Sequence, residues 1–405
     1  MKTLFHSAIV TSAIFLVPFF VSLLNIDFDF LDPLQQALKD FELTDIVYSQ
    51  MMDESSKRID TNIVIVNVGS LSRGNIAKVI DRVMQNKPKI AGVDVLFYKD
   101  TDPAETNALN GVLSNYDNIV LAEQLIRNLD GDVIEVRPGI KNANLLSKYH
   151  GYVNFPSEVG SFRTVRSVNP FVDFQNNRYS AFAVKLAELA DSESVAMLSK
   201  RNNTEEIIDF QKLKSYVRVE YSQVLDTSID MSFINNKIVL FGYLGMTMND
   251  ENSYEDRYFT PLNKRYAGKS FPDLFGVEIH GNILSMILSH DYVNSMNQVL
   301  NVIFSWIFCF VVVILFSGIE HKVPHYYDLI SKTIQIIALL FLLFIVVFCF
   351  DHFRFRFDIT LAAFSIALAA DGYSIYISAL TAREHKKSTK IKSSMQSTIK
   401  RRHKK

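Results

Sequence analysis

The sequence predicts an α/β domain with a mainly parallel sheet, attached to a four-helix transmembrane bundle with one N-terminal span and three C-terminal spans. Two observations predict this fold class. Between the first and second apolar stretches, short β-branched runs alternate with amphipathic segments, which is the pattern of β-α-β units. Four apolar stretches are long enough to cross a bilayer as helices, at residues 4–24, 299–319, 334–350 and 358–380.

Composition and charge support this division and exclude several classes of protein. The 405 residues are 48% hydrophobic, and 42 Lys+Arg against 43 Asp+Glu give a formal net charge of −1. Residues 383–405 contain ten Lys/Arg and one acid, so this tail carries +9 and the rest of the chain −10. The only cysteines, Cys309 and Cys349, lie in apolar runs. A disulfide-rich secreted scaffold, a disordered protein and a nucleic-acid binder built on overall basicity are therefore excluded.

The first apolar stretch is expected to stay in the mature protein. It directly follows Met1 and Lys2 and ends in LLNIDFDF, whereas a cleaved signal peptide ends in small residues of the A-x-A type. We therefore interpret this stretch as an uncleaved signal anchor.

The basic tail sets the predicted orientation. The positive-inside rule places it in the cytoplasm, and four spans return the N-terminus to the same side. The polar segment between the first and second spans then lies outside the membrane. The chain is expected to be a multi-pass protein of the bacterial inner membrane, with a signal anchor, an extracytoplasmic domain, three transmembrane helices and a basic cytoplasmic tail at residues 1–24, 25–298, 299–380 and 381–405.

The extracytoplasmic segment begins with a β-α-β unit. NIVIVNV at residues 62–68 is an apolar run typical of a buried strand, and the spacing of Ile76, Val79, Ile80 and Val83 predicts an amphipathic helix. Further strands are expected at 89–97, 118–122, 133–138, 162–168, 216–221 and 237–242. Further helices are expected at 104–113, 180–190 and within 275–288.

The order of these elements carries a family resemblance. The segments IVIVNV, GVDVLF, NIVLA, KIVLFG, YFTPL and GVEIHGN follow one another along the chain. In this order they resemble the CHASE2 domain, an extracytoplasmic sensory module of bacterial membrane receptors, over most of residues 25–298. FTPL at 259–262 and GVEIHGN at 276–282 are the most specific parts. The layout of one leading and three trailing spans is also similar to that family.

Two departures from the family pattern affect the expected function. Asn67 and the following SLSRGN stand where family members often carry an Asp and a Trp/Pro-rich segment. Typical relatives continue into a cyclase, kinase or other output domain, whereas only residues 381–405 follow the last predicted span here. The resemblance therefore implies a sensor that acts through a separate protein.

The motifs of common enzymes are incomplete in this sequence. GSLSRG at residues 69–74 follows a strand as a phosphate-binding loop does, but Asn75 and Ile76 replace the Lys and Ser/Thr that bind phosphate and Mg²⁺. We find no Ser/His/Asp or Cys/His arrangement for nucleophilic catalysis. We therefore expect no catalytic activity and no cofactor.

Asp94, Glu278 and His280 admit two interpretations. If residues 276–282 are extended, Glu278 and His280 share a face and could form a polar or metal-binding cluster with Asp94. Alternatively, Glu278 and His280 cap and anchor the start of a helix while Asp94 accepts backbone hydrogen bonds. We favour the second interpretation, because a metal site needs a third and a fourth ligand at suitable spacing and none is evident. No metal is expected.

A ligand crevice is expected beyond the carboxyl ends of the parallel strands. Residues 70–73, 98–100 and 242–246 would form one rim, where Arg73 and Lys99 could attract an anion, although both could also be ordinary solvated charges. The candidate ligand-binding residues are Arg73, Asp94, Lys99, Glu278 and His280.

Asp371 is the notable polar residue of the predicted spans. A carboxylate near the bilayer centre costs on the order of 3 kcal/mol, so we expect it to face the bundle. It could form an interhelical hydrogen bond to a Ser, Tyr or His, make a subunit contact, or belong to a proton or ion path. The basic tail could bind anionic lipid or an acidic cytoplasmic partner, and its Ser, Thr and Lys composition predicts disorder when it is free.

These observations favour a sensory function. Ligand or envelope state would change the outer domain, the helix after His280 would move relative to the spans, and an unknown cytoplasmic or inner-membrane protein would respond through the bundle and the tail. The alternative is a structural or scaffold subunit of an envelope complex that senses nothing. A homo-oligomer is compatible with both, and no nucleic acid is expected as a partner.

Overall fold

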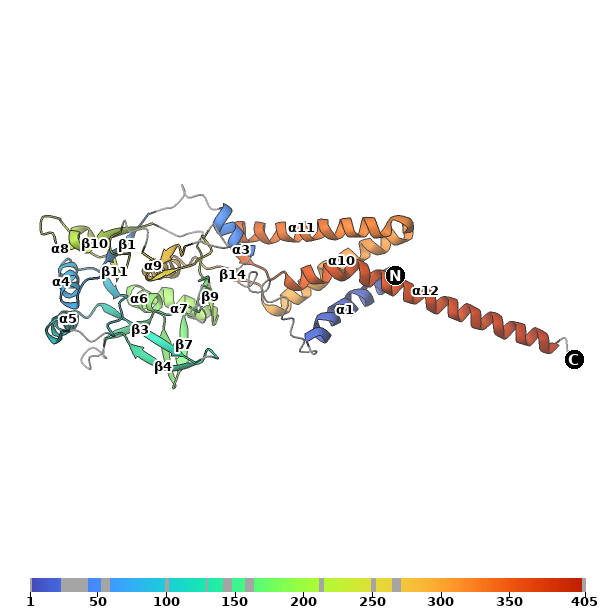
Figure 1. The fold of residues 1–405 in the computed structure, drawn as a ribbon, viewed down its shortest axis with the longest axis horizontal. Helices are drawn as coiled ribbons and strands as arrows, with labels where there is room; N and C mark the ends of the chain where they lie inside the picture. The colour runs from blue at the N-terminus through green and yellow to red at the C-terminus, as the bar shows by residue number, and fades with distance from the viewer. Residues whose placement is uncertain are drawn as a thin grey trace. The chain divides into compact units, whose positions relative to one another are not determined.

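The computed structural model describes residues 2–22, 43–51, 59–98, 102–128, 130–140, 148–156, 164–210, 215–248, 253–263 and 271–402. The chain divides into two compact units (Figure 1). The α/β unit comprises Leu34–Asn294, and the helical unit comprises Met1–Pro33 together with Ser295–Lys405. Each unit is described by itself.

A seven-stranded mixed sheet organises the α/β unit. Its hydrogen-bonded order is β10-β1-β11-β2-β3-β4, and β5 also pairs with β3. Every pairing is parallel except that of β3 with β4, which confirms the prediction of a mainly parallel sheet. The strands are β1 (Ile59–Asn67), β2 (Ile90–Val93), β3 (Ile119–Arg127), β4 (Val133–Pro138), β5 (Tyr149–Tyr152), β10 (Ser215–Glu220) and β11 (Ile238–Gly242).

Helices cover both faces of this sheet, which is why its central strands are continuous apolar runs. On one face, α4 (Arg73–Met84), α5 (Pro103–Asn115) and α8 (Tyr221–Leu225) share a buried core with the strands. Val64 and Val66 of β1 and the predicted apolar stripe of α4 meet in that core. On the other face lie α6 (Phe182–Ala190) and α9 (Gly276–Ser289), with α7 (Ser192–Arg201) packed against both.

Glycines in the strands let α6 and α9 approach the sheet closely. A Cβ atom on Gly92 would lie 2.7 Å from the ring of Phe182 in α6, and one on Gly242 would lie 2.5 Å from Cβ of Val277 in α9. No side chain fits in these spaces, so the two glycines determine how near the first turns of both helices come to the strands.

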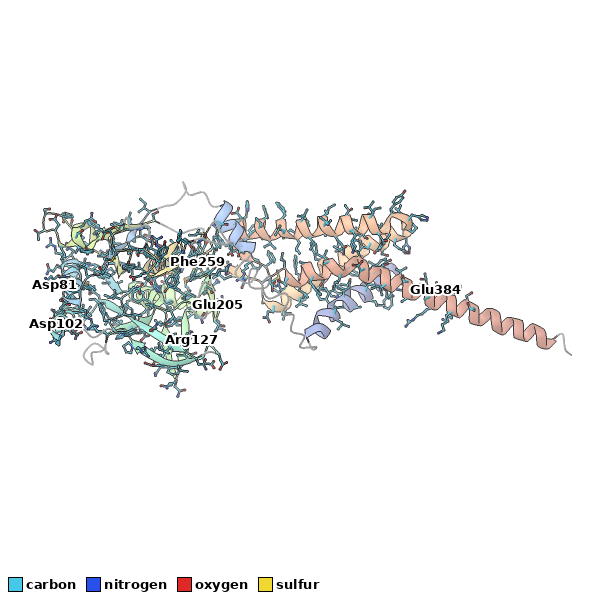
Figure 2. All side chains as sticks on the ribbon, viewed as in Figure 1. Asp81, Asp102, Arg127, Glu205, Phe259 and Glu384 are labelled. Carbon is cyan, nitrogen blue, oxygen red and sulfur yellow. The ribbon has the colours of Figure 1, made fainter. Side chains whose placement is uncertain are left out.

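A capping residue fixes the start of α5. Asp102 precedes α5 and accepts a hydrogen bond from the Ala104 N–H at 2.9 Å, with Pro103 at the first helical position (Figure 2). Short elements complete the unit: α3 (Leu43–Ile46), η2 (Val47–Met51), β6 (Ser167–Val168), β7 (Phe171–Phe174), β8 (Asn177–Ser180), β9 (Glu206–Ile207), η6 (Ser232–Ile234), β12 (Arg257–Tyr258) and β13 (Leu274–Phe275).

Two predicted strands are shorter than expected. The strand predicted at 89–97 pairs only over β2, because residues 94–98 leave the sheet and line a cavity. The strand predicted at 162–168 is reduced to β6 in its described part. There the Val165 N–H donates to the Phe259 carbonyl and the Arg166 guanidinium pairs with Asp45, so loop contacts replace a strand ladder.

Four long helices form the helical unit: α1 (Lys2–Ser22), α10 (Gln298–Lys322), α11 (Tyr327–Phe353) and α12 (Thr360–Arg402). Among the described residues, three segments are long and apolar enough to cross a membrane: Gln298–Lys322, Pro324–Phe353 and Thr360–Thr389. They correspond to the three predicted C-terminal spans. The N-terminal span stays a prediction, since the apolar helix described there is the shorter Leu4–Val17. The short η7 (Pro324–Tyr326), β14 (Asn294–Ser295) and β15 (Phe355–Arg356) lie outside these helices.

Helix α12 joins the other three helices into one core. Ile366, Ala369 and Tyr373 of α12 are buried together with Ile14 of α1 and Val313 of α10. At Gly372 a Cβ atom would lie 3.2 Å from the Ile14 side chain, so the absence of a side chain keeps α1 and α12 close.

The prediction that the basic tail is disordered is wrong for residues 381–402, because α12 continues without a break to Arg402. The physical reason is that helix elongation needs no new nucleus. The segment contains no Gly or Pro after Gly372 and is rich in Lys, Arg and Gln, which are good helix formers.

Candidate functional site

A cavity of about 620 Å³ lies in the α/β unit at the carboxyl ends of the parallel strands. Residues that follow β1, β2, β5 and β11 contribute to it, as do the first residues of α4 and α9. This is the edge of the sheet where the sequence predicts a crevice. Its lining comprises Val68, Gly69, Leu71, Ser72, Arg73, Ile76, Asp94, Val95, Leu96, Phe97, Tyr98, Glu105, Gln124, Val153, Asn154, Phe155, Tyr243, Asp256, Tyr258, Gly276 and His280.

Arg73 lines the cavity, but its donors are directed at protein groups. Its Nη1 donates to Thr106 Oγ1 and its Nη2 donates to the Phe97 carbonyl, both at 2.8 Å. The guanidinium carbon also lies 5.7 Å from the centre of the Phe97 ring. Lys99, the second cation of the predicted anion site, lies outside the described residues. Anion binding by this pair stays a prediction.

Asp94 and His280 come together in the structure, as the sequence analysis considered. The His280 Nε2 lies 4.0 Å from Asp94 Oδ2, and both residues line the cavity. Asp94 reaches this place because its N–H still bonds to the Phe241 carbonyl at 2.8 Å while the following residues turn away from the sheet.

Glu278 does not join them. Residues 276–289 are helical, so the extended arrangement that would place Glu278 and His280 on one face does not occur. Glu278 Oε2 instead accepts the Phe275 N–H at 3.3 Å, and its carboxylate pairs with Arg218. This is the capping role that the sequence analysis favoured. No group of three or more His, Cys, Asp or Glu in the described part of the chain is placed to hold a metal ion.

His280 is neutral and enclosed by aromatic rings. It is 3% exposed, stacks on Phe155 at 4.8 Å between ring centres, and meets Phe182 edge-on at 5.3 Å. Burial lowers the pKa of His280 to about 3, although a hydrogen bond with the Val153 backbone acts in the opposite direction. Its Nδ1 is buried and has no hydrogen-bond partner within the described ranges.

Asn67, at the end of β1, organises the loops beside the cavity. Its Oδ1 accepts the N–H groups of Gly69 at 3.0 Å and Leu244 at 2.9 Å. Its Nδ2 donates to Glu220 Oε2 at 3.0 Å and to the Gly245 carbonyl at 3.1 Å. All four hydrogen-bonding positions of the amide are therefore used. The sequence signal for this role was a fully buried polar residue at the end of a buried strand, where family members often carry Asp.

Three further lining residues had no signal in the sequence. Glu105 lies in the first turn of α5, and Asp256 and Tyr258 precede α9. None of them belongs to a recognisable motif, and their position in the cavity depends on how the loops fold over the strand ends.

The arrangement of helices, sheet and cavity agrees with a comparison against protein families. The model of the CHASE2 domain matches residues 9–319, which includes the whole α/β unit, most of α1 and most of α10. The chain belongs to the CHASE2 domain family. CHASE2 domains are extracytoplasmic sensory domains. No curated protein and no solved structure matches the chain.

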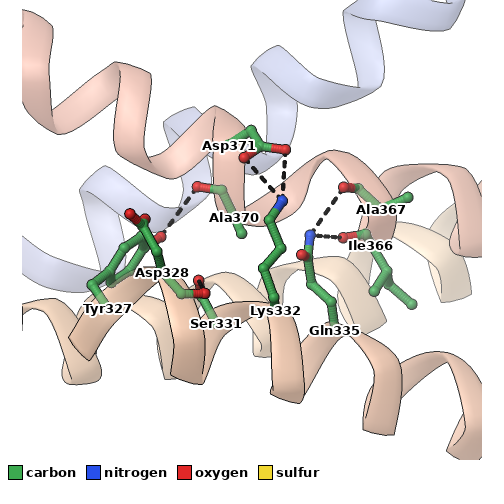
Figure 3. Close-up of polar contacts among 9 residues, drawn as sticks. All are labelled: Tyr327, Asp328, Ser331, Lys332, Gln335, Ile366, Ala367, Ala370 and Asp371. Carbon is green, nitrogen blue, oxygen red and sulfur yellow. Dashed lines mark hydrogen bonds and ion pairs between the residues drawn. The ribbon is translucent and has the colours of Figure 1, made fainter.

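In this CHASE2 chain, a second polar site joins α11 to α12 in the helical unit (Figure 3). The Lys332 Nζ donates to both carboxylate oxygens of Asp371, at 3.0 and 2.9 Å. Gln335 of α11 adds two further hydrogen bonds, in which its Nε2 donates to the carbonyls of Ile366 and Ala367 of α12 at 2.8 and 2.9 Å. Tyr327 donates its hydroxyl proton to the Ala370 carbonyl at 3.1 Å.

The expectation that Asp371 faces the bundle is wrong for the single chain, and its described interhelical partner is not the Ser, Tyr or His of the first of the three alternatives. The subunit contact and the proton or ion path stay predictions. The side chain of Asp371 is 62% exposed and its partner is a lysine that is 53% exposed. The sequence analysis overlooked Lys332 because this residue lies just before the predicted span 334–350, whereas α11 begins at Tyr327. A long Lys side chain reaches along the helix surface to the carboxylate of the neighbouring helix.

Proposed function

We propose that this CHASE2 protein is a four-span sensor of the bacterial inner membrane and has no catalytic activity of its own. The α/β unit would lie outside the cytoplasm and both termini inside it. A small ligand would occupy the cavity at the strand ends, and a separate cytoplasmic or inner-membrane protein would receive the signal.

The observation that carries this proposal is the place of α9 in the chain. Gly276 and His280, in the first turns of α9, line the cavity. Residues 290–297 then lead directly from the end of α9 into α10, a helix that is long and apolar enough to cross a membrane. A ligand that displaces the start of α9 therefore acts on an element joined by a short connection to the membrane part.

The proposed route to the cytoplasm continues through α12. This helix packs against α1, α10 and α11 and then extends as a basic helix to Arg402. A change in the packing of the spans would move this basic helix, to which an acidic partner or anionic lipid can bind.

Partner capture with a blocked cavity tests the sensory function. The full-length protein would be crosslinked in native membranes and its partners identified by mass spectrometry, for the wild type, Ser72→Trp and Ser70→Trp. Ser72 is an exposed residue of the cavity lining and makes no capping bond with its side chain, so a Trp there adds bulk at the cavity and removes no side-chain hydrogen bond. Ser70 is an exposed residue of the same loop and is absent from the cavity lining, which makes it the matched control.

A sensor predicts that Ser72→Trp changes the yield of the captured partner and that Ser70→Trp does not. A partner recovered in the same fixed ratio from all three variants, and in every growth medium, would instead support the structural or scaffold subunit.

Membrane-impermeant maleimide labelling of Asn202→Cys and Lys386→Cys, in a chain without Cys309 and Cys349, tests the orientation. Only the cysteine at position 202 should react in cells with an intact inner membrane.

A further inference from the structure

We propose that the ligand of this cavity is a small organic cation, such as a primary or quaternary amine. This inference rests on the proposed function, because it names the class of ligand for the same site. Three features of the lining carry it: the balance of charge, the carboxylates beside the two helix N-termini that open onto the cavity, and the aromatic walls.

Negative charge exceeds positive charge among the described lining residues. Asp94, Glu105 and Asp256 are acids, and Arg73 is the lone Lys or Arg described in the lining. At least two donors of Arg73 already bind Thr106 and the Phe97 carbonyl. His280 adds no charge because burial keeps its imidazole neutral. The potential inside the cavity therefore favours a cation.

Both helix N-termini at the cavity already have a carboxylate of the chain beside them. The N-terminus of a helix usually attracts an anion, through its unpaired N–H groups and the helix dipole. At the start of α4, Glu105 Oε1 lies 3.6 Å from the point where a Cβ on Gly74 would be. At the start of α9, Asp256 Oδ1 lies 3.1 Å from the corresponding point on Gly276. An incoming anion would meet these carboxylates.

Aromatic rings supply the surface on which an organic cation binds. Phe97, Tyr98, Phe155, Tyr243 and Tyr258 line the cavity, and Phe155 and Tyr258 meet edge-on at 5.1 Å between ring centres. The Arg73 guanidinium already lies over the Phe97 ring, so one of these walls accepts a cation in the structure itself. The ring faces attract positive charge, which is how ammonium ligands are recognised by aromatic cages.

His280 adds a neutral polar ring to the aromatic walls. It lines the cavity and stacks on Phe155, and burial keeps its imidazole uncharged. The cavity volume of about 620 Å³ is within the range of small-molecule sites.

Calorimetric titration of the full-length protein in maltoside detergent tests the class of ligand. The cationic probes are choline and putrescine. The neutral probe is dimethylbutanol, the uncharged carbon isostere of choline, and the anionic probes are inorganic phosphate and citrate. We expect saturable binding of a cationic probe that weakens as salt is added, and no binding of the isostere or the anions.

Matched variants locate the binding. Asp94→Asn, Glu105→Gln and Tyr258→Leu should each weaken binding of the cationic probe by about tenfold or more, which corresponds to the loss of one charge or ring contact. Asp173→Asn, an exposed acid of β7 that does not line the cavity, should leave the affinity unchanged. Three variants on different elements keep the test decisive if one of them does not fold.

The outcomes separate this inference from the proposed function. Phosphate or citrate binding that is lost in Arg73→Gln would contradict the inference of a cationic ligand and would leave the proposed sensory function unaffected. If no probe binds although Ser72→Trp changes partner capture, the inference of a cationic ligand is also contradicted, while the sensory function is supported. If no probe binds and Ser72→Trp leaves partner capture unchanged, both the cationic ligand and the sensory function are contradicted. Cation binding that survives all three lining substitutions would place the site elsewhere on the protein and contradict the inference.

Discussion

The α/β unit and the helical unit differ in how they bury polar side chains. In the α/β unit, the side chains of Asp45 and Glu206 are 0% and 2% exposed, and each carboxylate is paired with an arginine. In the helical unit, the hydroxyl groups of Ser305 and Ser365 are buried and have no partner among the described residues. Its described contact between Lys332 and Asp371 is on the surface of the helices instead.

The difference follows from the cost of burying each kind of group. A carboxylate removed from water without a partner costs several kcal/mol, and for Asp45 and Glu206 a guanidinium with several donors offsets this cost. A serine hydroxyl costs much less, and its small size lets helix backbones approach closely. Polar residues thus act as structural pairs in one unit and mainly as small side chains in the other.

The largest effect is expected when a buried pair of the α/β unit loses its cation. Arg201 donates to both oxygens of Glu206, to the Val293 carbonyl and to Asn294. Arg201→Met should lower the free energy of unfolding by about 3–5 kcal/mol, because the carboxylate stays buried without its partner. Amide hydrogen exchange of strand β1 in the full-length protein measures this loss. Arg178→Met, where an exposed guanidinium lies over the Phe171 ring, should cost less than about 1 kcal/mol.

The amide of Asn67 provides the next test, because it replaces the acid that family members often carry. Asn67→Asp would place a carboxylate where two donors now face Glu220 and the Gly245 carbonyl. We expect a loss of about 2–3 kcal/mol at pH 7, and a smaller loss at pH 4, where protonation restores a donor. The same exchange measurement at the two pH values checks this. Asn62→Asp, on the exposed part of β1, is the control and should be nearly neutral.

Glu123 is the exception in the α/β unit that sharpens the comparison. It is 6% exposed, and burial raises the pKa of its carboxyl to about 7, although Lys185 acts in the opposite direction. The folded pKa lies above the unfolded value of 4.5, so stability is full below pH 4.5 and falls as the pH rises through about 7.

Glu123→Gln should therefore stabilise the α/β unit by about 2 kcal/mol more at pH 8 than at pH 5. The pH dependence of β1 hydrogen exchange measures the difference between variant and wild type. Glu193→Gln, an exposed acid on α7, should show no such dependence. Equal effects of Glu123→Gln at both pH values would mean that the Glu123 carboxyl has the same pKa in the folded domain as in the unfolded chain.

The smallest effects are expected in the helical unit. Gln335→Leu removes two hydrogen bonds to α12 carbonyls and should cost about 1 kcal/mol, which is typical of interhelical hydrogen bonds in membranes. Ser365→Ala has no described bond to lose and should change stability by less than about 0.5 kcal/mol. The fluorescence of Trp306 during unfolding in dodecyl sulfate reports both. A loss at Ser365 as large as that at Gln335 would break the comparison between the units.

Much of the fold was predictable because it depends on local patterns. Strands β1, β4, β10 and β11 and helices α4, α5 and α6 lie where apolar runs, helical stripes and capping residues place them. The carboxyl edge of the sheet was also predictable, because parallel strands end on the same side. Segments whose conformation depends on contacts with residues distant in the sequence were less predictable. An example is the segment 162–168, where Arg166 forms an ion pair with Asp45.

The candidate site was predictable in its position and only partly in its chemistry. Arg73, Asp94 and His280 line the cavity as proposed, but the commitment of the Arg73 donors to Thr106 and Phe97 had no sequence signal. Glu278 was separated from them by the helical geometry of α9. Glu105 in the first turn of α5 and Asp256 in the turn before β12, which add to the negative charge of Asp94, belong to no motif.

The sequence by itself determined the family, the order of strands and helices along the chain, and the apolar helices that can cross a membrane. These properties depend on composition and on residue spacing within one segment. The tertiary structure alone decided that His280 meets Asp94, that Asn67 joins the loops after β1 and β11 to Glu220 of β10, and that Asp371 pairs with Lys332. Such contacts join residues far apart in the chain, and they depend on strand order, register and helix packing, which local periodicity does not specify.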